Sequence, residues 1–302
     1  MVFGVFRSPS AYLFLQDVTL INANSIGILY LVATPIGNLG DISSRAVETL
    51  RSVDFIAAED TRVTLKLLSH LGIRKPLISY YEHNSAESGR KIVSRILSGE
   101  SCALVTDAGT PAISDPGEDL VRLCAADDIT IIAIPGPCAA VSALALSGLP
   151  TGRFTFEGFL STARKSRFEH LNELTTEKRT MIFYEAPHKL LRTLNDMLIV
   201  LGDRRITISR ELTKLHEETL RFTMSQAIEH FEAAPPRGEF VLIIEGAKDA
   251  PASTDILADA ITAAQQYITE GLTVKDAAKR AAEETGASKN AIYKELVSIK
   301  DN

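Results

Sequence analysis

The sequence predicts an α/β protein with two α/β domains and a small helical tail. From residue 28 onward, short apolar runs alternate with amphipathic helical patterns, as in a mostly parallel sheet covered on both faces. A cluster of Pro and Gly at residues 149–152 ends this alternation. We therefore expect an N-terminal parallel-sheet domain over 28–150, a second domain with a mixed sheet over 151–248, and a helical tail over 254–302.

The N-terminal domain is expected to contain five buried strands. Apolar runs place them at 28–33, 54–58, 76–80, 102–106 and 130–134. Helices are expected at 43–52 and 85–97, and a further helix carries Leu65, Leu67, Leu68 and Leu71. Because strands and helices alternate, the strands should run parallel.

The second domain is expected to have strands that are only partly separated by helices. The strands are predicted at 154–158, 180–184, 206–209, 219–223 and 240–245, and the helices at 164–174, 188–200 and 224–233. This irregular order favours a mixed sheet.

The tail has the layout of a helix-turn-helix unit. Thr273 and Asp276 resemble the start of a capped helix, and Ser288 can cap a second one. Residues 272–302 carry six basic and five acidic side chains, so we expect little excess positive charge for binding nucleic acid. A packing or dimer-supporting role for the tail is an equally good interpretation.

Composition excludes several classes of protein. The net charge of −6 argues against coating nucleic acid by bulk charge, and no run of 18 apolar residues suits a membrane span. The three cysteines form no C-x-x-C pair, so we expect free thiols, a cytoplasmic protein and no metal site. Residues 1–27 fit no secretory signal, and we expect a largely disordered extension there.

Ligands of open parallel sheets bind at the carboxyl ends of the strands, so the loops that follow the strands are the candidate site. The loop at 106–117 holds two prolines and two glycines, which suits a rigid wall. The loops at 34–41 and 134–140 are similarly restrained and contain neither G-x-G-x-x-G nor a Walker lysine. Rigid, nearly uncharged loops favour an adenosine-like ligand over a polyphosphate.

Polar residues follow the second and third strands. Glu59, Asp60 and Arg62 lie at the end of the second, where Asp60 or Thr61 can also serve as a helix N-cap. His83 follows the third strand, although a lone histidine is more often structural than catalytic.

Seven short motifs of the sequence occur in the order typical of one known family. They are YLVATPIGNLGD at 30–41, AEDTR at 58–62, VTDAGTP at 105–111, IPGP at 134–137, FEGF at 156–159, FYEAPH at 183–188 and PRGE at 236–239. In these motifs the chain resembles ribosomal RNA small subunit methyltransferase I, a family of 16S rRNA cytidine 2′-O-methyltransferases in the tetrapyrrole-methylase (class III) superfamily. The resemblance runs from about residue 29 to 246, and residues before 28 lie outside it.

The resemblance implies S-adenosylmethionine (SAM) as methyl donor, bound in a cleft between the two α/β domains. It also implies a homodimer and a substrate in the decoding region of the small ribosomal subunit. The residues that the motifs would assign to the cofactor are Pro35, Asp107, Gly109, Thr110, Ile113, Pro135, Gly136, Pro137, Tyr184, Arg237 and Gly238.

Methyl transfer to a ribose hydroxyl requires positioning of the two partners and removal of a proton. The candidate proton acceptors are Glu59, Asp60, His83 and Glu185, which the sequence does not rank. Candidate contacts to RNA phosphates are Arg62, Arg164, Lys165, Arg167 and Lys189, although such a charge cluster is more often a solvated helix face.

Two other functions fit parts of the sequence. A small-molecule methylase acting on a tetrapyrrole shares the fold and the cofactor loops, whereas the basic cluster at 164–167 and the tail favour RNA. A non-catalytic regulator with a DNA-binding tail would need a strongly basic recognition helix, which the tail lacks.

Overall fold

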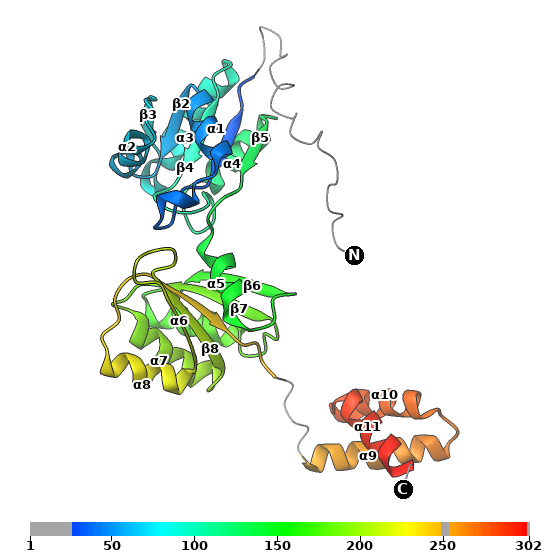
Figure 1. The fold of residues 1–302 in the computed structure, drawn as a ribbon. Coiled ribbons are helices and arrows are strands. Elements are labelled where there is room, and N and C mark those ends of the chain that lie inside the picture. Colours follow the sequence, from blue (N-terminus) through cyan, green and yellow to red (C-terminus); the bar gives the residue numbers. More distant parts are fainter. Residues whose placement is uncertain (1–25, 249–253, 301–302) are drawn as a thin grey trace, which may run out of the picture. The chain divides into compact units, whose positions relative to one another are not determined.

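The computed structural model describes residues 26–248 and 254–300 (Figure 1). The chain divides into two compact units at Gly246, and each is described by itself. The extension expected over 1–27 lies almost wholly outside the described residues. Within the described part of the chain, no helix is long and apolar enough to cross a lipid bilayer.

The first sheet is entirely parallel, as the alternating pattern predicts. Its strands are β1 (Leu29–Val32), β2 (Phe55–Ala58), β3 (Leu77–Ser79), β4 (Cys102–Val105) and β5 (Ile131–Ile134), in the order β3-β2-β4-β1-β5. Each predicted strand is confirmed to within two residues of its ends. All side chains of β2 and β4 are buried, because helices cover both faces of the sheet.

The two faces of this sheet have separate hydrophobic cores. On one face, α1 (Ser44–Ser52) and α2 (Thr61–His70) contribute Leu50 and Leu68 to the core. On the other, α3 (Ser85–Leu97) and α4 (Glu118–Ala126) contribute Ile92 and Leu120. Two short turns, η3 (Leu39–Asp41) and η4 (Glu82–Asn84), lie in the loops after β1 and β3. The helix α4 is absent from the sequence prediction.

The second sheet is mixed, as predicted. Its strands are β6 (Phe154–Phe159), β7 (Thr180–Glu185), β8 (Arg205–Arg210), β9 (Glu218–Thr223) and β10 (Phe240–Ile244), in the order β6-β7-β10-β8-β9. Only β6 and β7 pair in parallel, and the other neighbours are antiparallel. The helices α6 (Arg164–Glu173), α7 (Leu190–Leu201) and α8 (Met224–Ala233) share one hydrophobic core with one face of this sheet.

The opposite face of the second sheet is covered by α5 (Ala139–Ser147). Ala143 and Leu144 of this helix are buried against Ile182 and Val241 of the sheet. The domain boundary predicted after residue 150 places α5 in the first domain. The packing of α5, however, is with the second sheet.

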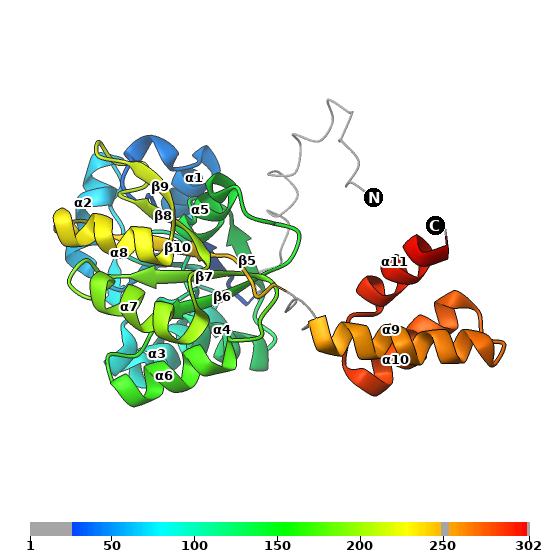
Figure 2. The same cartoon turned by 90° about the horizontal axis from the view of Figure 1, so that it is seen from below.

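The second unit is a bundle of three helices, α9 (Thr254–Thr269), α10 (Val274–Thr285) and α11 (Lys289–Lys300) (Figure 2). Small side chains let α9 and α10 approach closely, with Ala264 and Ala278 fully buried. Thr273 caps α10 by accepting a hydrogen bond from the Asp276 N–H, as the sequence predicts. Gly286 ends α10 in the left-handed conformation at φ +74°.

Candidate active site

A cleft of about 380 Å³ lies at the carboxyl ends of the first sheet and faces the second sheet. The first sheet contributes the loops after β1, β2, β4 and β5 to its wall. The second sheet contributes residues 184–187 at the end of β7, Glu211, Leu212 and Lys214 after β8, and residues 239–241 at the start of β10. The cleft is therefore built from both α/β halves of the first unit.

The loop at 106–117 is held rigidly against its neighbours. Thr34 and Gly109 exchange two backbone hydrogen bonds of 2.9 and 3.1 Å, which tie this loop to the one after β1. The Thr110 hydroxyl donates to the Pro137 carbonyl at 3.2 Å and ties it to the loop after β5. Ala112 and Ser114 have φ values of +66° and +61°, a conformation that non-glycine residues rarely adopt. Strain of this kind persists only where the surrounding structure enforces it.

The acid pair after β2 has two different roles. Asp60 caps α2, because its Oδ1 accepts a 2.8 Å hydrogen bond from the Arg62 N–H. Its carboxylate also forms a 2.6 Å ion pair with the Arg62 guanidinium, and this hydrogen bonding lowers the Asp60 pKa to about 2. A carboxyl held this acidic is a poor proton acceptor, and Asp60 does not line the cleft.

Glu59, in contrast, lines the cleft together with Asp107. The Asp107 N–H donates to Glu59 Oε2 at 3.3 Å, and the Asp60 N–H donates to Asp107 Oδ1 at 3.2 Å. Burial raises the pKa of both the Glu59 and the Asp107 carboxyls. Asp115 lines the same cleft, and burial and then the charges of Glu59 and Asp107 raise its pKa to about 6. Asp115 is not among the residues predicted from the sequence, although it lies in the loop at 106–117.

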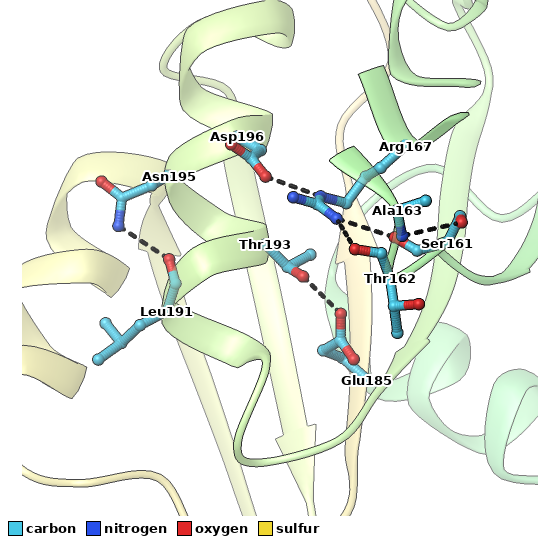
Figure 3. Close-up of polar contacts among 9 residues, drawn as sticks. All are labelled: Ser161, Thr162, Ala163, Arg167, Glu185, Leu191, Thr193, Asn195 and Asp196. Carbon is cyan, nitrogen blue, oxygen red and sulfur yellow. Dashed lines mark hydrogen bonds and ion pairs between the residues drawn. The ribbon is translucent and has the colours of Figure 1, made fainter. Parts of the chain in front are cut away.

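Tyr184 and Glu185 form the opposite wall at the end of β7. The Tyr184 hydroxyl accepts a 3.2 Å hydrogen bond from the Ala140 N–H at the start of α5, and burial raises its pKa to about 12. Glu185 is only 3% exposed. Its carboxylate accepts a hydrogen bond from the Ala186 N–H at 2.8 Å. It accepts a second one from the Thr193 hydroxyl at 2.5 Å (Figure 3). Glu185 therefore lines the cleft, but its carboxylate is already hydrogen-bonded to groups of the second α/β half.

Arg167 is not available to RNA in this structure, which corrects the expectation of a phosphate contact. Its side chain is 3% exposed and its Nε donates to Asp196 Oδ2 at 2.7 Å. Its Nη1 donates to the carbonyls of Ser161 and Thr162 at 2.9 and 3.0 Å (Figure 3). The guanidinium therefore fastens the segment after β6 to α7. Spacing alone could not distinguish it from its exposed neighbours.

The other predicted cationic contacts are at the surface. The Arg164 guanidinium lies 4.6 Å from the Phe168 ring centroid, and the Lys165 side chain is 88% exposed. Lys189 is half-buried at the start of α7. The Arg62 side chain is 86% exposed but is engaged by the Asp60 carboxylate. Phosphate contacts by these four cations stay a prediction.

The predicted cofactor residues divide into two groups. Those that line the cleft are Asp107, Gly109, Thr110, Ile113 and Tyr184. Those that do not line it, although a near neighbour in sequence does, are Pro35, Pro135, Gly136, Pro137, Arg237 and Gly238.

Two glycines of the second group serve close backbone packing. A Cβ on Gly136 would lie 2.9 Å from the Cβ of Ala33, and one on Gly238, at φ +86°, would lie 2.6 Å from the Glu211 side chain. The side chain of His83 lies outside the described part of the structure. Among the described residues, no group of three or more His, Cys, Asp or Glu side chains could hold a metal ion.

Comparison with known proteins identifies the family. A family model described as tetrapyrrole (corrin/porphyrin) methylases matches residues 28–228, and a model of the RsmI C-terminal HTH domain matches residues 255–300. Ribosomal RNA small subunit methyltransferase I of Synechocystis sp. is 50% identical over 272 residues, which cover 89% of this chain and 96% of that protein. The chain belongs to the ribosomal RNA small subunit methyltransferase I family. The Bacillus subtilis member of this family is 44% identical over 274 residues, covering 89% of this chain and 94% of the relative.

Solved structures of tetrapyrrole methylases share the fold of this family member. Cobalt precorrin-4 methyltransferase, a cobalamin biosynthetic enzyme, has a TM-score of 0.57 at 17% identity, over 75% of this chain and 98% of that one. Uroporphyrin-III C-methyl transferase from Thermus thermophilus, complexed with S-adenosylhomocysteine, has a TM-score of 0.51 at 17% identity, over 72% of this chain and 97% of that one. At this identity the likeness extends to the fold alone.

Proposed function

We propose that the chain is a SAM-dependent methyltransferase that methylates the ribose 2′-hydroxyl of a cytidine in the decoding region of 16S rRNA. The observation that carries the proposal is the combined match of methylase unit and tail to relatives named for rRNA methylation. The two tetrapyrrole methylase structures named above cover 72–75% of the chain, whereas the rRNA methyltransferases to which it is similar cover 88–90%. This difference favours RNA over a tetrapyrrole as the substrate.

The residues of the cleft fit SAM as a ligand. Its volume of about 380 Å³ lies within the usual range for small-molecule sites. Ile36, Leu212 and Val241 provide apolar surface for an adenine ring, and Asp107 can accept hydrogen bonds from ribose hydroxyls. The carboxylates in the wall suit a ligand that carries a sulfonium cation.

The chemical demands of the reaction match what the chain provides. SAM supplies an activated methyl group, so the protein has to position the acceptor, exclude water and remove one proton. The rigid loop at 106–117 supplies a preorganised wall, and the acids at the ends of β2, β4 and β7 supply candidate proton acceptors. Among the residues predicted for this role, Glu59 and Glu185 line the cleft.

The assembled state is also part of the proposal. We infer a homodimer that acts in the cytoplasm on the small ribosomal subunit, as the family resemblance implies. Arg62, Arg164, Lys165 and Lys189 are the proposed contacts to rRNA phosphates, and their exposure or partial exposure is compatible with this role.

The test uses small ribosomal subunits from a strain that lacks the gene. The subunits are incubated with the full chain and SAM labelled in the methyl group, and the labelled nucleotide is mapped. We expect one labelled 2′-O-methylcytidine in the decoding region. Label found only in a porphyrin-type compound offered in parallel would overturn the proposal in favour of the tetrapyrrole methylase alternative.

A further inference from the structure

Two cavities of the first unit share one wall. Beside the cleft lies a second cavity of about 330 Å³, lined by residues of η4 and α3 and by the start of α4. Ser114 and Asp115 line both cavities. A methyl donor in the cleft and an acceptor in the second cavity would therefore meet beside Asp115.

The second cavity suits hydrogen-bond donors and not phosphates. Its charged lining residues in the described structure are all acidic: Glu82, Asp115, Glu118 and Asp119. Carboxylates repel phosphate but accept hydrogen bonds from sugar hydroxyls and base amines. The sugar and base of a nucleotide therefore fit this cavity, with its phosphates outside.

Asp115 differs from the other acids of the cleft in having a free carboxylate. Glu59 and Asp107 each accept a backbone hydrogen bond, and Glu185 accepts two hydrogen bonds. Among the described residues, the Asp115 carboxylate has no hydrogen-bond partner. The backbone immediately before it is constrained, since Ser114 has a φ of +61°. The carboxylate thus lines both cavities while its oxygens stay available.

We propose that Asp115 accepts the proton of the acceptor hydroxyl, and that this hydroxyl enters from the second cavity. The proposal rests on the proposed function. In the step, the hydroxyl O–H bond breaks and the proton passes to the Asp115 carboxylate. The hydroxyl oxygen forms a bond to the methyl carbon, the bond from this carbon to sulfur breaks, and its electron pair stays on sulfur, which becomes a neutral thioether.

Burial, and then the charges of Glu59 and Asp107, make the Asp115 carboxylate a stronger base than an ordinary aspartate. The acids Glu59 and Asp107 face it from the ends of β2 and β4, and Tyr184 faces it from β7. In the second cavity it adjoins Glu82, Glu118 and Asp119, and the last two form ion pairs with Arg122 of α4. Lys214, the single cation among the described lining residues, is bound to Glu211 and Glu239.

This environment predicts a pH dependence with a definite sign. Burial and the neighbouring negative charges raise the Asp115 pKa to about 6, so the basic form accumulates as pH rises through this value. The rate of methyl transfer should therefore rise with pH around 6 and level off above it.

The test compares Asp115→Asn with the wild-type chain in single turnovers on small ribosomal subunits. We expect a rate loss of about 10²–10⁴-fold and disappearance of the rise around pH 6. SAM binding by calorimetry should be unchanged, and Asp115→Glu should regain part of the lost rate. Independently of activity, ¹³C NMR of the SAM-free protein should show an aspartate carboxyl that titrates near pH 6 and is absent from Asp115→Asn.

The matched control is Asp127→Asn, which makes the same change at the exposed C-terminal end of α4 and should leave the rate and its pH profile unchanged. A rate for Asp115→Asn close to that of the wild type would overturn the role of Asp115 while leaving the proposed function intact. Loss of SAM binding in Asp115→Asn would also overturn it, because the residue would then be a SAM contact. Failure of the wild-type chain to methylate the subunits would count against the proposed function itself.

Discussion

The ion pair between Arg167 and Asp196 allows a quantitative test of how the second α/β half is held together. The two side chains are 3% and 11% exposed, so the pair is almost fully removed from water. The substitution Asp196→Ala would leave the guanidinium buried with only the carbonyls of Ser161 and Thr162 as partners. Removing one member of a buried pair typically costs about 3–5 kcal/mol, because the remaining charge is uncompensated.

We therefore expect Asp196→Ala to lower the free energy of unfolding by about 3–5 kcal/mol. The double variant Arg167→Met with Asp196→Ala should lose less, because it no longer buries a charge. The assay is urea unfolding followed by far-ultraviolet circular dichroism, since the chain has no tryptophan to serve as a fluorescent probe. Hydrogen exchange should show increased opening of residues 161–163, which Arg167 ties to α7.

The control is Glu87→Ala, which breaks the ion pair with Lys91 on the surface of α3. Both side chains are more than half exposed, and the urea midpoint should not change measurably. A loss below about 1 kcal/mol in Asp196→Ala, the level of an exposed pair, would refute the inference that Arg167 has a structural role.

Three further predictions concern residues in the wall of the cleft or close to it in sequence. Tyr184→Phe leaves the N–H at the start of α5 without its acceptor and should cost about 1–3 kcal/mol in urea unfolding; an unchanged midpoint would mean that this hydrogen bond is replaced by water. Gly238→Ala should lower stability by more than about 1 kcal/mol, because alanine disfavours a φ of +86° and its Cβ would lie 2.6 Å from a glutamate side chain; thermal unfolding checks this. The Asp60 carboxyl should titrate near pH 2 by NMR, with its stabilising effect present above its ordinary pKa and lost as pH falls through 2, and Arg62→Ala should raise this pKa. A normal Asp60 pKa in the wild type would contradict the cap-and-pair geometry.

Hydrophobic pattern was sufficient to predict both sheets but not every helix. The strands of the first sheet and β10 are apolar runs, whereas β6, β8 and β9 mix apolar with polar or β-branched residues, and both signals are local. The helix α5 has no polar face, because its sequence AAVSALALS is apolar or small on every side. Hydrophobic periodicity therefore does not predict this helix. Its packing on the second sheet depends on contacts with residues far along the chain.

The loops of the candidate site could be predicted from the sequence because they are rich in Gly and Pro. The roles of single charged residues could not be predicted in this way. Arg167 and Lys165 lie two positions apart, yet one is buried and the other is exposed. The orientation of the helix determines which of the two side chains is buried, and the clustering of charges in the sequence does not predict that orientation. Asp115 was missed for a related reason, since its importance comes from two cavities that meet only in three dimensions.

The packing of α5 on the second sheet has a consequence for synthesis of the chain. The helix ends at residue 147, whereas β10, which supplies Val241 and Ile243 beneath it, ends at residue 244. A translating ribosome must add nearly 100 residues between the two, which takes roughly 5–20 s at typical elongation rates. Until β10 is made, the nascent chain carries an apolar helix whose sheet is incomplete, and exposed apolar surface of this kind is what chaperones bind.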